Sequence, residues 1–192
     1  DYAQTNLAYL EGHGIVYPHT YLVPIGGLPN YPAWLQEQGE LPATPDARYD
    51  VLFYGDVNAP RRKALLKALG ERFALRIEGD LFGSALRSAV AGAKVVVNLH
   101  YYEGALLETT RIYECLSLGV PVVSETSADM DEHAARLEGA VRFFPVGDAE
   151  AMLRAVAQTL EQGAQQAAMK QSVQASSAQF DFMLWRSLFA LR

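Results

Sequence analysis

Arg111 and Glu114 stand out as charged residues within an otherwise apolar stretch of the sequence, from residue 103 to residue 125. This stretch is typical of a glycine turn, a helix that ends at Gly119 and an apolar strand. A charge in a buried helix costs free energy unless it is paired or used, so these two residues are the first candidates for chemistry. Because they are three positions apart, they share one helix face and can pair with each other. Alternatively, Glu114 accepts hydrogen bonds from a ribose diol, and Arg111 contacts phosphate or has a structural role.

Basic residues at the beginning of an earlier helix form a candidate phosphate site. The strand predicted at residues 50–54 is followed by Gly55, and the next helix begins with Pro60-Arg61-Arg62-Lys63. Exposed helix amides together with Arg61 and Arg62 can hold a phosphate. The alternative, favoured when this stretch is taken alone, is a solvated helix face. The chain contains neither the G-x-G-x-x-G pattern nor the P-loop pattern, so sites of those two types are disfavoured.

A second candidate anion site follows the strand predicted at residues 94–99. His100 comes directly after this strand, and Gly104 and Ala105 precede a helix predicted at residues 106–118. The free N–H groups of a helix N-terminus carry partial positive charge and accept a diphosphate at little cost. His100 is more typical of a hydrogen-bonded strand end than of a ligand-binding residue.

Acidic residues of the same region have simpler interpretations. Glu103 can contact a ligand or favour a helix start, and for Glu108 the helix start is the preferred interpretation. Asp129-Met130-Asp131 matches a D-x-D metal pattern, but it follows Ser127 and precedes Glu132-His133, as a helix start does. We therefore predict a capped helix here and no metal site, and we assign no catalytic residue.

Alternating strands and helices must position these side chains. Continuously apolar strands with short connections to helices predict an α/β class, a Rossmann-like doubly wound parallel sheet covered on both faces. In such sheets ligands bind at the carboxyl ends of the strands, where the strand order reverses. The predicted strands are 50–54, 73–77, 94–99, 120–124 and 140–145, and the predicted helices are 60–69, 81–89, 106–118 and 149–160.

Flanking segments extend this domain at both ends. Residues 1–48 are predicted to be an interdomain segment and linker, with a short helix at 2–11, a strand at 19–25 and a proline-rich stretch at 28–48. Residues 49–163 form the predicted ligand-binding domain. Residues 164–192 are a C-terminal helical extension whose last helix is apolar on more than one side.

Composition excludes several classes of function. The 192 residues carry a formal net charge of −6 and no long run of Lys or Arg, which argues against binding to nucleic acid. No apolar run approaches the length of about 20 residues that a membrane span needs. The single cysteine, Cys115, excludes an internal disulfide framework and predicts a reducing, cytoplasmic location. The chain begins with Asp1 rather than Met, as expected of a processed product or a fragment.

Together these features resemble the C-terminal, donor-binding half of GT-B fold glycosyltransferases, over about residues 20–192. The most specific part is the helix and strand from Glu114 to Val123, Glu-Cys-Leu-Ser-Leu-Gly-Val-Pro-Val-Val. In the family this stretch reads as a glutamate, a small residue, Leu or Met, and then Ala-x-Gly-x-Pro-Val-Val. The likeness is nearest to the group-1 branch that includes spore-coat-type, CgeB-like proteins. The family often carries another glutamate where this chain has Leu106, and Glu103 stands three residues before that position.

The resemblance implies transfer of a sugar from a nucleoside diphosphate sugar to an acceptor hydroxyl, without a metal or another cofactor. Glu114 inherits the role of holding the donor's ribose. The charge on the leaving diphosphate would be stabilised by the amides of Gly104 and Ala105 and by Arg61 or Arg62.

The resemblance also implies that a partner domain is missing. Residues 6–10 and 21–26 are similar to the end of a GT-B N-terminal domain and the crossover that follows it, and the last helix resembles the segment that returns to that domain. The N-terminal domain supplies the acceptor site, so residues 1–192 alone are expected to bind donor and transfer little. Two alternatives remain open: a non-catalytic Rossmann-like module that binds a nucleotide or a protein, and a nucleotide-sugar epimerase of the same fold.

Overall fold

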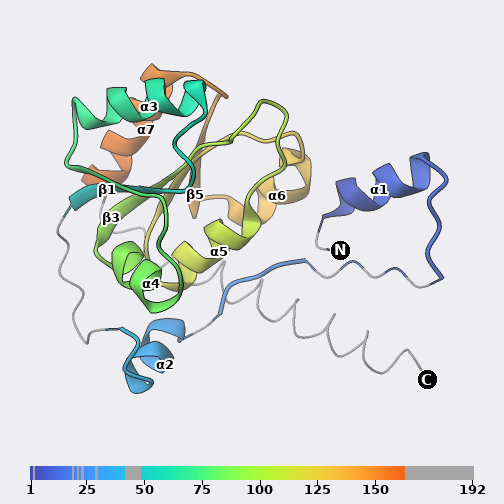
Figure 1. Ribbon diagram of the computed structural model, residues 1–192, viewed down its shortest axis with the longest axis horizontal. Coiled ribbons are helices and arrows are strands. Elements are labelled where there is room, and N and C mark those ends of the chain that lie inside the picture. Colours follow the sequence, from blue (N-terminus) through green and yellow to red (C-terminus); the bar gives the residue numbers. More distant parts are fainter. Residues whose placement is uncertain are drawn as a thin grey trace.

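A five-stranded, all-parallel sheet in the order β2-β1-β3-β4-β5 forms the centre of the protein, as seen in a computed structural model (Figure 1). The structure describes residues 1, 3–18, 20, 22, 24–28, 30–41 and 49–162. The strands are β1 (Tyr49–Tyr54), β2 (Leu75–Glu78), β3 (Ala93–Asn98), β4 (Val122–Glu125) and β5 (Val141–Phe144). The helices are α1 (Gln4–Gly12), α2 (Tyr31–Glu37), α3 (Pro60–Gly70), α4 (Gly83–Ala91), α5 (Thr109–Ser117), α6 (Met130–Leu137) and α7 (Ala149–Gln162).

Helices cover both faces of this sheet. Alternate strand residues point to opposite faces, so Leu52 and Val96 pack with α4 and α5 while Val51 and Val95 pack with α3 and α7. All four strand residues are fully buried, which is why the strands read as continuous apolar runs. Figure 1 shows α3 and α7 on one side of the sheet and α4 and α5 on the other. The predicted doubly wound α/β class is confirmed.

The strand order reverses between β1 and β3. From β1 the chain goes through α3 on one face to β2, and from β3 it continues through α5 on the other face to β4. Strands β1 and β3 are hydrogen-bonded neighbours in the sheet, with Val51 opposite Val95. The helices that follow these two strands therefore diverge to opposite faces. In open α/β sheets ligands bind in a crevice at such a point, outside the carboxyl ends of the strands, and we refer to this place between β1 and β3 as the crevice.

Helix α2 lies within the segment predicted to be a linker. Its Leu35 is fully buried in the core cluster that also contains α4 and α5, and Leu41 is 6% exposed. An ion pair between Glu40 and Arg87 joins the end of this segment to α4. The sequence suggested a linker because of its prolines, but Pro32 is tolerated in the first turn of a helix, where its missing N–H costs nothing.

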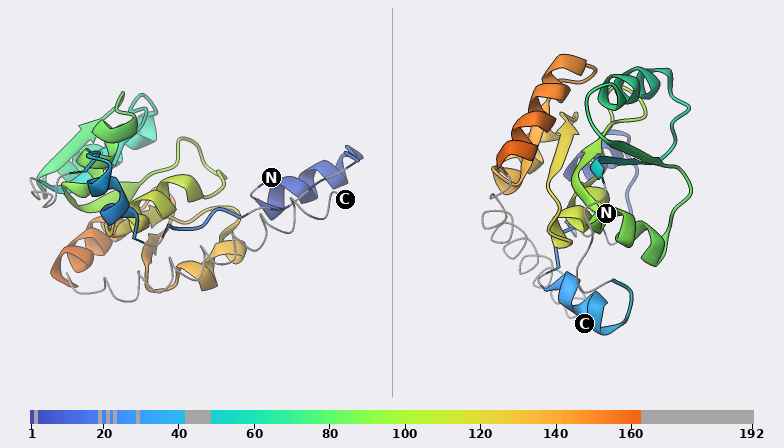
Figure 2. Two further views of the ribbon diagram at one scale, coloured as in Figure 1. Left: turned by 90° about the horizontal axis from the view of Figure 1, so that it is seen from below. Right: turned by 90° about the vertical axis from the view of Figure 1, so that its left-hand side faces the viewer.

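Helix α1 confirms the short helix predicted near the N-terminus and extends away from the sheet on the side of α6 (Figures 1 and 2). The strand predicted at residues 19–25 falls partly outside the described residues, and its described residues are not in a strand. The predicted C-terminal helix lies outside the described residues. No helix within the described ranges is long and apolar enough to cross a membrane.

Candidate functional site

Gly55 directly follows β1, at the carboxyl edge of the sheet where the strand order reverses. Its φ of 134° is a conformation that favours glycine. A Cβ atom at this position would lie 3.4 Å from Arg111 Nη2 and 3.8 Å from Arg62 Nη1. Two guanidinium groups, one from α3 and one from α5, therefore lie close to the same piece of backbone.

Arg62 is held rigidly by the protein and is only 5% exposed. Its Nε and Nη2 donate to the carbonyl oxygen of Leu99 at 3.1 and 2.6 Å, and its Nη1 donates to the carbonyl oxygen of Asp56 at 2.8 Å. The guanidinium also lies 5.4 Å from the ring centroid of Phe53 and 5.2 Å from that of Tyr101. Burial, reinforced by the positive charge of Arg111, lowers the pKa of Arg62. Among the described residues no carboxylate hydrogen-bonds to it, so its positive charge is not neutralised by a direct ion pair there.

Arg111 reaches the same place from the other face of the sheet. Its Nη1 donates to Asn98 Oδ1 at 2.6 Å, and its guanidinium lies 4.7 Å from the ring centroid of Tyr54. The Nε atom is buried and has no hydrogen-bond partner among the described residues. Arg111 and Glu114 form no ion pair within the described part of the chain, so the simpler of the two sequence interpretations does not hold.

Glu114 is half-buried on α5, and its carboxylate has no hydrogen-bond or ion-pair partner among the described residues. Burial raises the pKa of this carboxyl, partly offset by the positive charge of Arg87 on α4. Glu114 also contributes to the raised pKa of Tyr54, which is due first to burial. It follows Arg111 by one turn of α5, so a carboxylate without a partner among the described residues lies on the helix face that carries Arg111.

Arg61 has a different environment from Arg62. Its guanidinium forms two hydrogen bonds with the carboxylate of Glu125, at 2.5 and 3.0 Å, and donates to the carbonyl oxygen of His100 at 2.5 Å. Of the three consecutive basic residues only Lys63 is exposed. The favoured interpretation of a solvated face is therefore wrong for Arg61 and Arg62, because both are drawn inward by carbonyl and carboxylate oxygens.

Glu125 was not singled out by the sequence analysis, although it is fully buried at the end of β4. Besides Arg61 it accepts hydrogen bonds from the backbone N–H groups of His100, at 2.7 Å, and Gly147, at 2.8 Å. One carboxylate thus fixes α3 and the loops that follow β3 and β5. Its position directly after an apolar strand was the available signal.

The loop after β3 differs from the prediction. Helix α5 begins at Thr109 rather than at residue 106, so Gly104 and Ala105 are not at its N-terminus. Glu103 and Gly104 are exposed in a turn, and Ala105 is buried with its carbonyl oxygen accepting a hydrogen bond from Ala128 N–H at 3.1 Å. The helix starts later because Glu108 has φ −75° and ψ 68°, outside the helical region, and the carbonyl oxygen of Leu107 accepts the N–H of Thr109 at 2.8 Å. Asp129 Oδ1 accepts the N–H of Leu107 at 2.9 Å and ties this loop to the beginning of α6.

Glu108 occupies the N-cap position of α5, so it does lie at a helix start, but its side chain belongs to a partly buried polar network. It makes no side-chain cap of α5, and its Oε2 accepts Asn98 Nδ2 at 2.6 Å and lies 3.0 Å from His100 Nδ1. Burial alone would raise the pKa of Glu108, but contacts with His100, Asn98 and Arg111 outweigh it and lower the pKa. Asn98 was missed by the sequence analysis.

His100 is 1% exposed, which agrees with a hydrogen-bonded strand end. Its Nε2 lies 3.1 Å from the carbonyl oxygen of Thr126, and its Nδ1 faces Glu108. Both partners only accept hydrogen bonds, so the ring is best paired when both nitrogens carry a proton. Burial would lower the pKa of His100, but the carboxylates of Glu108 and Glu125 outweigh this effect and raise it.

This raised pKa predicts how stability depends on pH. The protonated ring stabilises the fold fully below the unfolded-state pKa of about 6.5, and this contribution is lost as pH rises through the higher folded-state pKa. Urea unfolding between about pH 6 and pH 9 should show the free energy of unfolding falling with pH in the wild type and falling less steeply in His100→Gln. The control His13→Gln, in an exposed position, should keep the wild-type slope. An unchanged slope in His100→Gln would show that the buried ring does not carry this proton.

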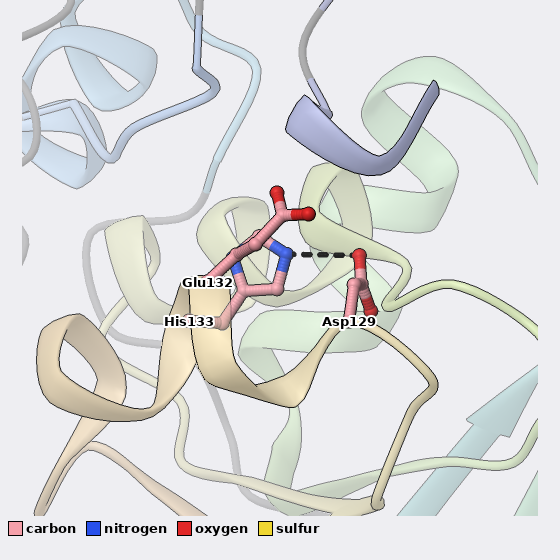
Figure 3. Close-up of side chains that lie close together, drawn as sticks. All are labelled: Asp129, Glu132 and His133. Atoms are coloured by element: carbon pink, nitrogen blue, oxygen red, sulfur yellow. Dashed lines mark hydrogen bonds and ion pairs between the residues drawn. The ribbon is translucent and has the colours of Figure 1, made fainter. Parts of the chain in front are cut away.

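Asp129 and His133 form a buried pair at the beginning of α6 (Figure 3). His133 Nε2 lies 3.1 Å from Asp129 Oδ2, while Asp129 Oδ1 is taken by Leu107 N–H. The side chain of Asp129 makes no cap of its own helix, although α6 does begin at the next residue. The capping role is therefore wrong, and Asp129 instead joins α6 to the loop after β3.

Glu132 completes a group whose ligand atoms all lie within 4.8 Å of one another, a spacing that a metal ion can use. Its carboxylate, however, accepts the backbone N–H groups of Gln4 at 3.0 Å and Thr5 at 2.9 Å, as well as the Thr5 hydroxyl. It therefore caps the N-terminus of α1. Two helix N-termini direct partial positive charge at this group, which stabilises the carboxylates and opposes a cation.

Comparison with solved structures supports the fold. Sucrose-phosphate synthase from Thermosynechococcus elongatus matches 99% of this chain with a TM-score of 0.63 and 20% identity. An α,α-trehalose-phosphate synthase (UDP-forming) from Burkholderia vietnamiensis matches 99% with a TM-score of 0.64 and 14% identity. The spinosyn rhamnosyltransferase SpnG, solved with thymidine diphosphate, matches 83% with a TM-score of 0.52 and 12% identity.

The chain spans 58% of the sucrose-phosphate synthase, 60% of the trehalose-phosphate synthase and 50% of SpnG. No protein-family model matches the sequence. No curated protein matches it either. The structural likeness confirms the expected fold, a Rossmann-like half of GT-B architecture.

Proposed function

We propose that this chain is the donor-binding half of a glycosyltransferase and that it binds a nucleoside diphosphate sugar in the crevice between β1 and β3. The observation that carries the proposal is the meeting of Arg62 and Arg111 over Gly55, one turn of α5 away from the free carboxylate of Glu114. Two cations beside a carboxylate match a diphosphate joined to a ribose diol. The solved structures with this fold include a UDP-forming synthase and a transferase bound to thymidine diphosphate, which supports a nucleoside diphosphate as the ligand. Of these two nucleotides, only uridine diphosphate carries the complete ribose diol.

In this proposal each side chain has a distinct part. Arg62 and Arg111 contact the diphosphate, and Glu114 accepts hydrogen bonds from the ribose hydroxyls. Arg61 and His100 act indirectly, since both are bound to Glu125 and support the loop after β3. The exposed turn of Glu103 and Gly104, with Ala105 behind it, borders the sugar.

The reaction we propose is transfer of the sugar to an acceptor hydroxyl once the chain is joined to its N-terminal half. The bond between the anomeric carbon and the diphosphate oxygen breaks with its electron pair on the diphosphate, and the acceptor oxygen forms the new bond. The acceptor proton leaves to a base of the other half. Arg62 and Arg111 stabilise the charge that develops on the leaving group, without a metal ion or a cofactor. A CgeB-like branch of the family and a cytoplasmic location are part of the same proposal.

Nucleotide binding by this chain tests the proposal directly. Isothermal calorimetry with the diphosphates of uridine, guanosine, adenosine and thymidine is expected to show binding of at least one of them. Arg111→Met, which removes the guanidinium and keeps the length of the side chain, should weaken that binding about tenfold, as expected for a charge-assisted hydrogen bond.

The matched control is Arg154→Met on α7, where the arginine is exposed and pairs with Glu150. Its affinity should equal that of the wild type. If the wild type binds none of the four diphosphates, or if both variants lose affinity equally, the crevice is not a diphosphate site.

A further inference from the structure

A buried amide connects Glu108 to Arg111. Asn98 at the end of β3 is fully buried, and its Nδ2 donates to Glu108 Oε2 at 2.6 Å and to Ser124 Oγ at 3.0 Å. On its other side, Asn98 Oδ1 accepts Arg111 Nη1 at 2.6 Å. Glu108 thus reaches the guanidinium of Arg111 from behind, through one intermediate side chain.

The hydrogen-bonding types along this path allow a single arrangement of the Asn98 side chain. An ionised carboxylate can only accept hydrogen bonds, so Glu108 must face the NH₂ group of the amide. The Ser124 hydroxyl already donates to the backbone oxygen of Glu125 at 2.8 Å, so it too can only accept from Asn98. Both neighbours therefore turn the amide so that its oxygen faces α5.

This arrangement sets the position of Arg111 before any ligand arrives. The guanidinium is held at Nη1 by Asn98, while its Nη2 atom lies next to Gly55 and its Nε atom has no partner among the described residues. If the amide were reversed, its NH₂ group would face the arginine, and two donors would oppose each other. The low pKa of Glu108 keeps the carboxylate ionised near neutral pH and so maintains this arrangement.

We propose that Glu108 is a positioning residue of the crevice, which fixes the Asn98 amide and thereby holds Arg111 where a diphosphate oxygen binds. This inference rests on the proposed function of the crevice. It differs from the role of an acidic residue at a helix start, because Glu108 acts through Arg111 and does not itself touch the ligand.

A double-mutant cycle separates these roles. The wild type, Glu108→Gln, Arg111→Met and the double variant are titrated by calorimetry with the diphosphate that the wild type binds most tightly. Glutamine has the same shape but can also donate, so Glu108→Gln is expected to weaken binding about fivefold, the size of one net hydrogen bond. In the Arg111→Met background the same substitution should have no further effect. A Glu108→Gln penalty that persists in that background would overturn the proposal.

A control and a second measurement distinguish positioning from folding and from failure of the proposed function. Thr109→Val removes a buried hydroxyl that has no partner in the described part of the chain, one residue from Glu108, and should leave the affinity unchanged. The Arg111 Nε–H resonance, assigned by its loss in Arg111→Met, should shift or broaden in Glu108→Gln without ligand. An unchanged resonance would overturn the positioning role, whether or not any diphosphate binds. Absence of binding by the wild type would contradict the proposed function alone.

Discussion

Replacing Glu114 by glutamine is expected to weaken the binding of a nucleoside diphosphate about ten- to a hundredfold, because a charged acceptor of two hydrogen bonds contributes about 1.5–3 kcal/mol. The carboxylate has no partner among the described residues, so the substitution breaks no contact that the described part of the fold uses. The thermal midpoint should therefore stay within the error of the wild type. Calorimetry on the wild type and Glu114→Gln measures the loss, and Glu138→Gln, at an exposed site after α6, is the matched control.

The ribose itself can be tested with two further ligands. Inorganic pyrophosphate lacks the ribose, so Glu114→Gln should bind it as well as the wild type does. The 2′-deoxy form of the ribonucleoside diphosphate that the wild type binds most tightly lacks one hydroxyl of the diol, so the wild type should bind it more weakly and Glu114→Gln should barely distinguish the two. An unchanged affinity for the complete nucleotide in Glu114→Gln would remove Glu114 from the site.

Replacing Glu125 by alanine is expected to lower the free energy of unfolding by about 3–5 kcal/mol, since removing one partner of a buried ion pair leaves the other charge unpaired. The substitution removes the carboxylate that pairs with Arg61. It also leaves the backbone N–H groups of His100 and Gly147 without this acceptor. Urea unfolding monitored by far-ultraviolet circular dichroism measures the change.

Glu150→Ala provides the comparison, because its ion pair with Arg154 is exposed on α7. That variant should lose no more than about 1 kcal/mol, as exposed pairs contribute little. Equal losses in the two variants would mean that the Glu125 contacts do not stabilise the fold more than a surface pair does. The more conservative Glu125→Gln should lie between them, since its oxygen can still accept part of the hydrogen bonds.

Much of the fold could be predicted from the sequence because the apolar residues of its strands and helices follow a regular pattern. Strand residues are buried on both faces of the sheet, Leu52 on one and Val95 on the other, and helices such as α3 and α4 begin at proline or glycine. The beginning of α5 was misplaced because Leu106 and Leu107 continue the apolar pattern of the helix. The structure instead has a non-helical turn at Glu108, and Asp129, which is distant in the sequence, anchors the N–H of Leu107.

The candidate site was predictable only in part. Strand ends and a charged helix face pointed to Gly55, Arg111 and Glu114, and the structure brings Gly55 and Arg111 together with Arg62. The different environments of Arg61 and Arg62 could not be predicted from the sequence. Arg61 bonds to Glu125 and Arg62 to the carbonyl oxygen of Leu99, and both acceptors lie on other elements of the fold. Their roles in binding a donor stay predictions until ligands are tested.

The confinement of Arg62 has a consequence for the energetics of recognition. An arginine on a surface loses rotamer freedom when it binds a ligand, and this loss of side-chain entropy lowers the affinity of the complex. Here two carbonyl oxygens and two aromatic rings immobilise the guanidinium as the chain folds. The side-chain entropy is lost once, during folding, so the proposed ligand would meet a preorganised cation. Selectivity among ligands should then depend on how well each one fits the fixed position of the Arg62 guanidinium, rather than on adaptation of this side chain to the ligand.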